Sequence, residues 1–379
     1  MKARAREALS RLDAYCKRVD YRGFDLYDGL NSGVFKKSPA NRSPMLRLAW
    51  IQLFKRSPFN LRPIAGVPRG VNPKGLALFA SGLIRAGRLS EAARLLERLK
   101  RMVCTGYEGY CWGYDFPWQS RAFYVPLGTP NIVTTVFVAN AFLDHFCATG
   151  DSCSLEFGRG ACEFILSHLV VFERGAALSF GYIPGRQVIV HNANLLGAAL
   201  LGRVFGLVGD KRYFEKSGKA IFHAVGALNR EWLWPYGELS HHGFIDNFHT
   251  GFNLVSLADW SRSTGDNRWE AELSRAYRAY LDFFWRPDGR PGYYHDRLYP
   301  LDIHCSAQGI ITLSKLAGYD ERSEKLLSKA VAWVLSNMQD ETGYFYYQKH
   351  KNHTNRISYM RWAQAWMFYA LSTYLMEPG

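Results

Sequence analysis

The sequence lacks several features that would place it in a class at once. Its seven cysteines form no CxxC pair, and no run of 18 or more uncharged apolar residues occurs in the 379 residues. The first absence gives no support for a zinc or dithiol site, and the second removes the usual signature of a membrane-spanning helix. Residues 1–21 also lack the apolar run of a signal peptide. We therefore expect a cytoplasmic protein with free thiols and no metal site.

Familiar catalytic motifs are absent as well. The sequence contains no GxxxxGK[ST] phosphate loop, no GxGxxG dinucleotide motif, no HExxH and no GxSxG. It also has neither the DDxxD nor the DxDD motif of terpene cyclases. These absences argue against nucleotide-dependent enzymes, zinc peptidases, serine hydrolases and terpene cyclases, and we expect no cofactor.

Basic charge and aromatic rings are what the sequence has in excess. Lys and Arg total 47 against 33 Asp and Glu, a net charge of +14, and aromatic residues reach 15%. Such a surface attracts polyanions, and aromatic faces stack on sugars. The basic residues are scattered, which disfavours nucleic acid, except in 47–70, where they mix with aromatic residues. This segment could contact a membrane surface, a polyanion or a partner protein, or be a plain outer helix with a solvated loop.

A repeated glycine turn is the most informative pattern. Apolar helical runs end at ATGD, LVGD, STGD and AGYD, whose last residues are Asp151, Asp210, Asp266 and Asp320. One copy follows another after 54 to 59 residues. Gly suits the left-handed position that closes a helix, and the polar residue after it suits the start of the next helix.

Each turn separates two kinds of helix. The helices before the turns are apolar nearly all round, as buried helices are, and the helices after them carry one charged face. The buried helices are expected at 72–86, 131–149, 191–208, 249–264, 304–317 and 359–375, and the exposed ones at 91–102, 155–170, 212–230, 268–285 and 321–338. Residues 2–19 supply a sixth outer helix.

Helical hairpins at this period form either an open solenoid or a closed ring. Six inner helices with six outer partners favour the ring, so we predict an all-α protein with a single (α/α)6 toroid domain over residues 1–379. One end carries the short turns. The other end, the mouth, carries long loops and receives the N-termini of the inner helices, which suit anions. We expect the functional cleft at the mouth.

Candidate site residues lie near the starts of the inner helices. His249 follows Asp246 by three positions and shares a helix face with Asn253, which would give a base, a carboxylate to orient it and an amide to bind substrate. The catalytic candidates are His249, Glu238, Asp246, Tyr236 and Tyr359. The substrate-binding candidates are His191, Asn194, Asn253, Asp302, His304, Gln308, Arg361, Trp112, Tyr114 and Trp234.

Structural roles are alternatives for several of these residues. The amides of Asn194, Asn253 and Gln308 could bond to each other along the axis of the ring. Asp246 and Asp302 could simply cap the inner helices that follow them. His249 could be a histidine needed only for packing.

Two reactions use residues of these types. Removal of the C5 proton of a uronic acid needs a base, an acid and a neutralised carboxylate, which His, Tyr, Asn and Arg can supply in an epimerase or a lyase. Glycoside hydrolysis needs two opposed carboxyl groups, for which the pairs are Glu238 with Asp246 and Asp115 with Asp302. A non-catalytic glycan-binding or assembly protein is the third possibility.

Six segments also carry a resemblance. They are GFDLYDGLNS at 23–32, LRLAWIQLFKRSPFNLRP at 46–63, NPKGLALF at 72–79, LGTPNIVTT at 127–135, HNANLLGAALL at 191–201 and IDNFHTGFNL at 245–254. They resemble proteins encoded in bacterial exopolysaccharide clusters, of the VpsJ type, which implies an α/α toroid that makes or trims a polysaccharide. More distantly, the helical part resembles the C-terminal domain of D-glucuronyl C5-epimerases, which implies catalytic roles for Glu238 in WPYGE and Tyr359 in YMRW.

The combined expectation is an enzyme of exopolysaccharide biosynthesis that acts on an acidic, uronate-containing glycan. C5-epimerase or lyase chemistry stands ahead of hydrolysis. Its expected partners are an acidic oligo- or polysaccharide and other polysaccharide-biosynthesis proteins, and peripheral contact with a membrane remains open.

Overall fold

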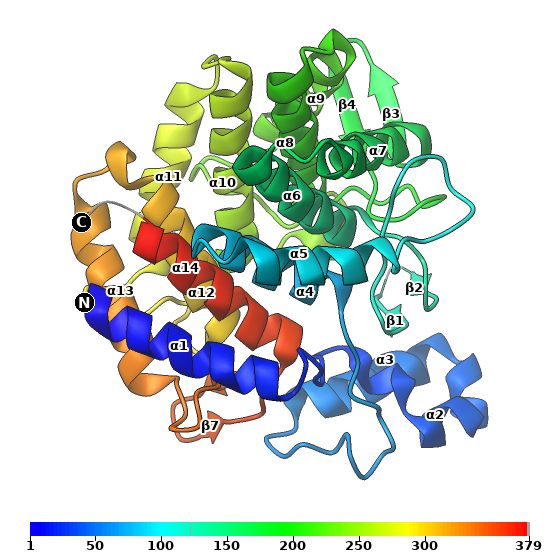
Figure 1. Cartoon of the computed structure of the whole chain (residues 1–379), viewed down its shortest axis with the longest axis vertical. Helices are drawn as coiled ribbons and strands as arrows, with labels where there is room; N and C mark the ends of the chain where they lie inside the picture. The colour runs from blue at the N-terminus through cyan, green and yellow to red at the C-terminus, as the bar shows by residue number, and fades with distance from the viewer. Residues whose placement is uncertain (122, 377–379) are drawn as a thin grey trace.

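A closed ring of inner helices forms the centre of the computed structural model, which describes residues 1–121 and 123–376. The inner helices are α4 (Pro73–Arg85), α6 (Ile132–Thr149), α8 (His191–Val208), α10 (Asn247–Thr264), α12 (Ile303–Lys315) and α14 (Trp366–Met376). Each contacts the next along the chain, and α14 contacts α4 (Figure 1). The predicted (α/α)6 toroid is therefore confirmed, and the open solenoid is wrong.

A second layer of helices surrounds this ring. It consists of α1 (Lys2–Arg18), α5 (Leu89–Lys100), α7 (Ser152–His168), α9 (Lys211–Val225), α11 (Glu270–Phe284) and α13 (Arg322–Asn337). Helix α1 packs against α14 and α13, and Lys2 donates from Nζ to the carbonyl of Tyr374 at 3.0 Å. The predicted helices agree with the observed ones within a few residues, because turn chemistry and amphipathic pattern agree throughout the chain.

The glycine turns have the expected geometry in three of the four copies. Gly150, Gly209 and Gly265 adopt the left-handed conformation, with φ of 75°, 76° and 73°. Asp151 accepts hydrogen bonds from the main-chain N–H groups of Cys153 and Ser154, so it caps α7. In the fourth copy, AGYD, a tyrosine separates Gly from Asp, and a 3₁₀ turn over Ala317–Tyr319 joins the helices instead.

The mouth loops contain short antiparallel sheets. Strand β1 (Trp118–Gln119) pairs with β2 (Tyr124–Val125), and β3 (Val170–Arg174) pairs with β4 (Ala177–Phe180). Strands β5 (Leu301–Asp302), β6 (Gln348–Lys349) and β7 (Thr354–Asn355) form the third sheet. Strand β4 packs mainly on α9 and β1 on α3 (Pro44–Arg56), whereas β5 leads directly into the inner helix α12.

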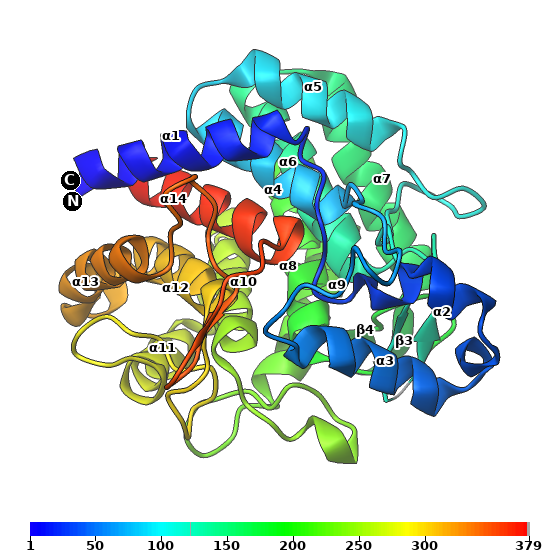
Figure 2. The same cartoon turned by 90° about the horizontal axis from the view of Figure 1, so that it is seen from below.

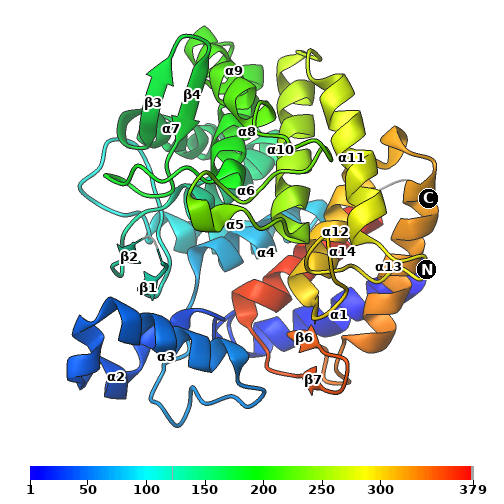
Figure 3. The same ribbon diagram turned by 180° about the vertical axis from the view of Figure 1, so that it is seen from behind.

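A small helical unit lies outside both rings. It contains α2 (Gly33–Lys37), the 3₁₀ turn η2 (Pro39–Arg42) and α3 (Pro44–Arg56). Helix α3 packs on β1 and on the 3₁₀ turns Asp28–Asn31 and Pro39–Arg42. Figures 1, 2 and 3 all show α2 and α3 at the edge of the molecule, beside the mouth loops. The segment 47–70 thus begins in a helix that is peripheral to the toroid.

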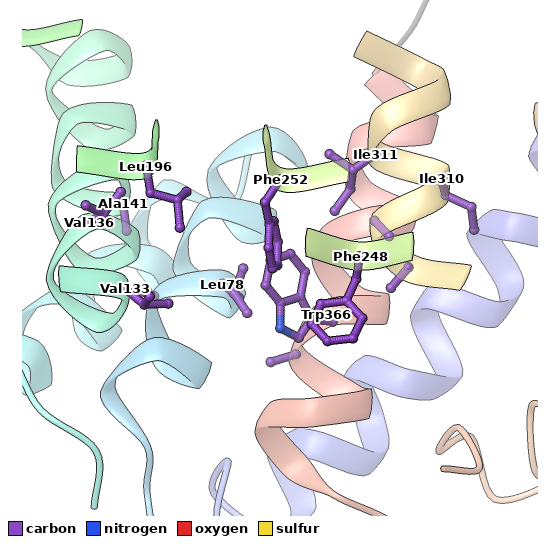
Figure 4. Packing of buried hydrophobic residues seen from close by; sticks show 14 of the residues in the cluster. Leu78, Val133, Val136, Ala141, Leu196, Phe248, Phe252, Ile310, Ile311 and Trp366 are labelled. Carbon is purple, nitrogen blue, oxygen red and sulfur yellow. The ribbon is translucent and has the colours of Figure 1, made fainter. Parts of the chain in front are cut away.

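The core fills the bore of the ring with apolar side chains from the inner helices. Figure 4 shows Phe248, Phe252 and Trp366 near its centre, between aliphatic residues of α4, α6, α8 and α12. Among the described residues, α6 alone has the length and composition of a membrane span, but 56% of it is buried within the protein. The composition of α6 is accounted for by its place in this core.

Candidate functional site

Two cavities occupy opposite ends of the bore. They are separated by the rings of Phe137, Phe252 and Trp366, with centroid distances of 5.2 Å from Trp366 to each of the other two. The cavity at the turn end measures about 270 Å³, and the mouth pocket about 160 Å³. At the turn end, Asp144 forms ion pairs with Arg85 and Arg203, which also line the cavity. Asp259 pairs with Lys315 at 2.6 Å. The mouth pocket differs in that several polar atoms of its lining, such as both ring nitrogens of His304 and Oδ1 of Asn192, have no hydrogen-bond partner among the described residues.

The floor of the mouth pocket is built by one position of the repeat. The second residue of every inner helix lines it, if the π-helical turn Met360–Ala365 is counted as the start of the last one. These residues are Lys74, Val133, Asn192, Phe248, His304 and Arg361. Six helix N-termini therefore converge on this pocket, and their partial positive charges favour a ligand with negative charge.

His249 is held by a carboxylate on its own helix. Asp246 caps α10: its Oδ1 accepts the main-chain N–H of His249 at 2.9 Å, and its Oδ2 lies 2.7 Å from His249 Nδ1. Because a carboxylate only accepts, Nδ1–H donates, and Nε2 carries the free lone pair. Among the described residues Nε2 has no hydrogen-bond partner, and His249 lines the pocket beside the ring of Tyr236. An imidazole held in this way can accept a proton at its free Nε2.

His304 lies in the same pocket and is 1% exposed. Both its ring nitrogens are buried without a hydrogen-bond partner in the described part of the chain. Burial, with Lys74 and Arg361 nearby, holds the pKa of the His304 imidazole well below its ordinary value. A neutral ring with one free donor and one free acceptor is costly to bury, so it marks a place where a polar ligand would be bound.

Lys74 was not among the residues expected from the sequence. It is 3% exposed and lies within an aromatic cage, with Nζ 4.4 Å from the ring centroid of Phe137, 4.9 Å from Trp366 and 5.5 Å from Phe252. No carboxylate pairs with it among the described residues. Burial, together with the Arg361 guanidinium, holds the pKa of Lys74 well below its ordinary value. An anionic group in the pocket would stabilise the ammonium form.

Arg361 is committed to a partner in the protein. Its Nε and a terminal nitrogen donate to the two carboxylate oxygens of Asp25, at 2.7 and 2.6 Å. The guanidinium also lies 5.1 Å from the ring centroid of Tyr114. Arg361 therefore lines the pocket as expected, but its charge is neutralised by a bidentate ion pair.

The walls of the pocket are aromatic. Tyr114 and Tyr236 were expected there, and Tyr182, Trp118 and Trp362 join them. The hydroxyl groups of Tyr114 and Tyr182 are 3.0 Å apart. A neighbouring groove of about 380 Å³ shares Trp118, Tyr182 and Tyr236 with the pocket, so rings continue from one into the other. Rings in this arrangement offer stacking faces to sugars.

The expected carboxylates, by contrast, do not line the pocket. Asp302 is buried, caps α12 through the N–H of His304 at 2.8 Å, and accepts from Gln348 and Trp362. Asp115 accepts from the amide of Asn72 at 2.6 Å. Glu238 lies outside the pocket and contacts His223 Nε2 at 2.8 Å. Asp246 does not line the pocket itself but contacts His249, which does. Neither expected carboxylate pair therefore lies in the mouth pocket.

The polar column along the inner helices is not arranged as we expected. Asn194 does not face the lumen: it accepts from the N–H of Phe180 at 3.0 Å and donates to the carbonyl of Ala220 at 2.9 Å. Gln308 lies at the turn-end cavity and donates to Thr312. Asn253 is buried outside the pocket, and its Oδ1 has no partner in the described part of the chain. These amides do not bond to one another, and Asn194 instead ties strand β4 and helix α9 to α8.

Four further candidates are packed into the core around the site. Trp112 donates to the carbonyl of Leu99 at 2.8 Å, and Trp234 donates to that of Ala224 at 2.9 Å. Tyr359 is buried and accepts from Arg62 at 3.0 Å. His191 is buried beside Asn192, and burial lowers its pKa to about 4. None of the four side chains lines the mouth pocket.

Comparisons with known proteins support the fold. No protein-family model matches the chain, and no curated protein matches it significantly. Among solved structures, a cellobiose 2-epimerase from Bacillus thermoamylovorans is similar, with a TM-score of 0.64 and 12% identity over 80% of this chain and 86% of that one. A sugar epimerase from a ruminal bacterium is similar with a TM-score of 0.64 and 12% identity, over 82% of this chain and 90% of that one. A GH76 α-mannanase from Bacteroides thetaiotaomicron is similar with a TM-score of 0.59 and 13% identity, over 80% of this chain and 85% of that one. At such identities the likeness establishes the (α/α)6 toroid.

Proposed function

We propose that this protein is a carbohydrate-active enzyme that moves a proton at a carbon next to the carbonyl or carboxylate of a sugar, as an epimerase or a lyase. The observation that carries the proposal is His249. Its Nδ1 is fixed by Asp246 at 2.7 Å, and its Nε2 is free in a pocket with aromatic walls. Similar solved structures include two cellobiose 2-epimerases, a D-mannose isomerase and a polysaccharide lyase.

The chemistry follows from the positions of three groups. Nε2 of His249 removes the proton, and the electron pair moves onto the substrate oxygen. The Lys74 ammonium, unpaired at the pocket floor, stabilises the charge that develops there. An epimerase also needs an acid that returns a proton to the other face. His304, which has no partner among the described residues, can fill this role only as an imidazolium, a form that an anionic substrate beside it would stabilise. In a lyase the glycosidic bond breaks instead.

An acidic glycan of an exopolysaccharide is the proposed substrate. The supporting features are the net charge of +14, the six helix N-termini at the pocket and the unpaired Lys74. A uronate would place its carboxylate at Lys74. Removal of its C5 proton would add further negative charge to the same carboxylate oxygens. Hydrolysis is a poorer fit, since none of the described residues lining the pocket is Asp or Glu.

One incubation series separates the candidates. The protein is mixed in D₂O with uronate polymers and with reducing disaccharides such as cellobiose. Deuterium uptake next to the carbonyl or carboxylate reports an epimerase, and absorbance of an unsaturated uronate reports a lyase. New reducing ends without that absorbance would indicate a hydrolase. Binding without any product would indicate a glycan-binding protein and overturn the proposal.

A further inference from the structure

Large apolar side chains are exposed together on residues 33–69, which comprise α2, η2, α3 and the loop that follows and are called the α2–α3 unit below. Of the 15 large hydrophobic residues that are exposed in the described chain, six lie between positions 34 and 64: Val34, Met45, Leu46, Leu53, Phe59 and Ile64. Met45, Phe59 and Ile64 are 74%, 76% and 85% exposed. Such a concentration is unusual for a surface that faces only water.

Helix α3 turns an apolar stripe outward. Leu46, Ala49 and Leu53 are exposed and lie on one face, at spacings of three and four, whereas Ile51 and Phe54 are buried on the other. Leu46 and Leu53 line a shallow apolar groove with Val34 of α2. The loop that carries Ile64 is tied to the start of α2, because Gly33 donates its N–H to the carbonyl of Gly66 at 3.1 Å. The exposed groups of α2, α3 and this loop are thus fixed to one another.

The charge around these apolar groups has one sign. No Asp or Glu occurs from position 29 to position 90. The exposed basic residues of the unit are Lys36, Lys37, Arg42, Arg56 and Arg69. None of the five pairs with a carboxylate among the described residues. Protruding apolar side chains flanked by unpaired cations complement an anionic lipid surface, where the apolar groups enter the acyl boundary and the cations meet the headgroups.

We propose that the α2–α3 unit, defined by residues 33–69, docks the protein on an anionic membrane surface. The mouth would then open close to that membrane, since Gln52 of α3 lines the groove that adjoins the mouth pocket. This inference does not depend on the reaction, because none of the exposed residues of the unit lines the mouth pocket.

Sedimentation with vesicles tests the inference on the full chain. The protein is mixed with vesicles of phosphatidylcholine alone and with vesicles that also contain phosphatidylglycerol. We expect binding that requires phosphatidylglycerol and weakens with salt. The double variant F59S/I64S should release the protein from the vesicles. The double variant K36E/K37E should weaken binding about 25-fold or more, at about fivefold for each of the two lost positive charges near the surface.

Two matched variants control for general effects. L127S changes a side chain that is 58% exposed in a different loop, and K325E reverses an exposed charge on α13. Both should bind the vesicles as the unaltered protein does. Equal binding to both kinds of vesicle, or loss in the controls as well, would overturn the proposal. So would self-association that F59S/I64S abolishes without any vesicle binding, since the surface would then be a protein interface.

Discussion

Asp246 engages His249 twice, once through the main chain and once through the ring. One carboxylate oxygen accepts the main-chain N–H of His249 in the first turn of helix α10, and the other lies 2.7 Å from Nδ1. The same side chain therefore starts the helix and fixes the direction of the imidazole. The sequence offered capping and catalysis as alternatives for Asp246, and the geometry combines them.

Replacing Asp246 with Asn separates these two roles. Asn is as good an N-cap as Asp, so the melting temperature of D246N should stay close to that of the unaltered protein. The amide no longer provides a charge to stabilise the imidazolium, so we expect turnover to fall at least tenfold and its pH profile to change. Rates and thermal unfolding measured on one preparation check both parts. A variant that unfolds early but keeps its turnover per folded molecule would show that Asp246 acts only as a cap.

Lys74 is expected to show opposite effects on stability and activity. K74M removes a buried amine that has no carboxylate partner among the described residues and whose protonation burial disfavours, and an apolar chain suits the aromatic cage. The free energy of unfolding should therefore rise by about 1 kcal/mol or more, while activity on an acidic glycan falls. Chemical denaturation and steady-state kinetics measure the two effects.

A matched change at the other end of the bore supplies the comparison. K315M leaves Asp259 without the ion pair at 2.6 Å, so it should lower stability and leave kcat unchanged. If K74M were destabilising and kinetically silent, the assignment of Lys74 to the site would be wrong.

His191 should make stability depend on pH between about 6.5 and 4. Burial lowers its pKa to about 4, from an ordinary value of 6.5. Between these values the unfolded chain binds a proton that the folded protein does not, so stability is lost as the pH falls through this window. The loss amounts to at most about 3 kcal/mol. Denaturation of H191Q across this range should show a flatter profile, and an unchanged slope would exclude His191 as the cause.

Asn194 is expected to be structural. N194A removes both hydrogen bonds that tie strand β4 and helix α9 to α8, and it leaves a buried main-chain N–H at Phe180 without its partner. We expect the free energy of unfolding to fall by about 2 kcal/mol with kcat nearly unchanged. A large fall in kcat at full stability would restore the original expectation that Asn194 binds substrate.

The fold could be predicted from the sequence because the repeat is visible at every level. Left-handed Gly at Gly150, Gly209 and Gly265 marks the turns, and apolar or amphipathic pattern distinguishes the inner helices from the outer ones. The α2–α3 unit could not be placed in this way. Its apolar stripe faces outward, so periodicity alone gives no direction for its packing.

A pocket lies at the end of the ring where we expect the functional cleft, but its lining comes partly from another column of residues than the polar one. The amides of the polar column, such as Asn194, lie further along the helices. The lining residues instead follow the caps by two positions: Asn72 caps α4 and precedes Lys74, and Asp302 caps α12 and precedes His304. Counting two residues from each Asn or Asp cap would have identified Lys74. Arg361 pairs with Asp25 and Glu238 contacts His223, residues that lie elsewhere in the sequence. No pattern near Arg361 or Glu238 in the sequence predicts these partners.

Deuterium exchange with His249 intact or replaced tests the central claim most directly. Proton NMR in D₂O follows the hydrogen next to the carbonyl or carboxylate of the sugar, with uronate polymers and reducing disaccharides as substrates. The unaltered protein should exchange this hydrogen. H249N should exchange it about 10²- to 10⁴-fold more slowly, with sugar binding and melting temperature retained. Exchange by H249N at the rate of the unaltered protein, or no exchange by either on any substrate that binds, would contradict the account.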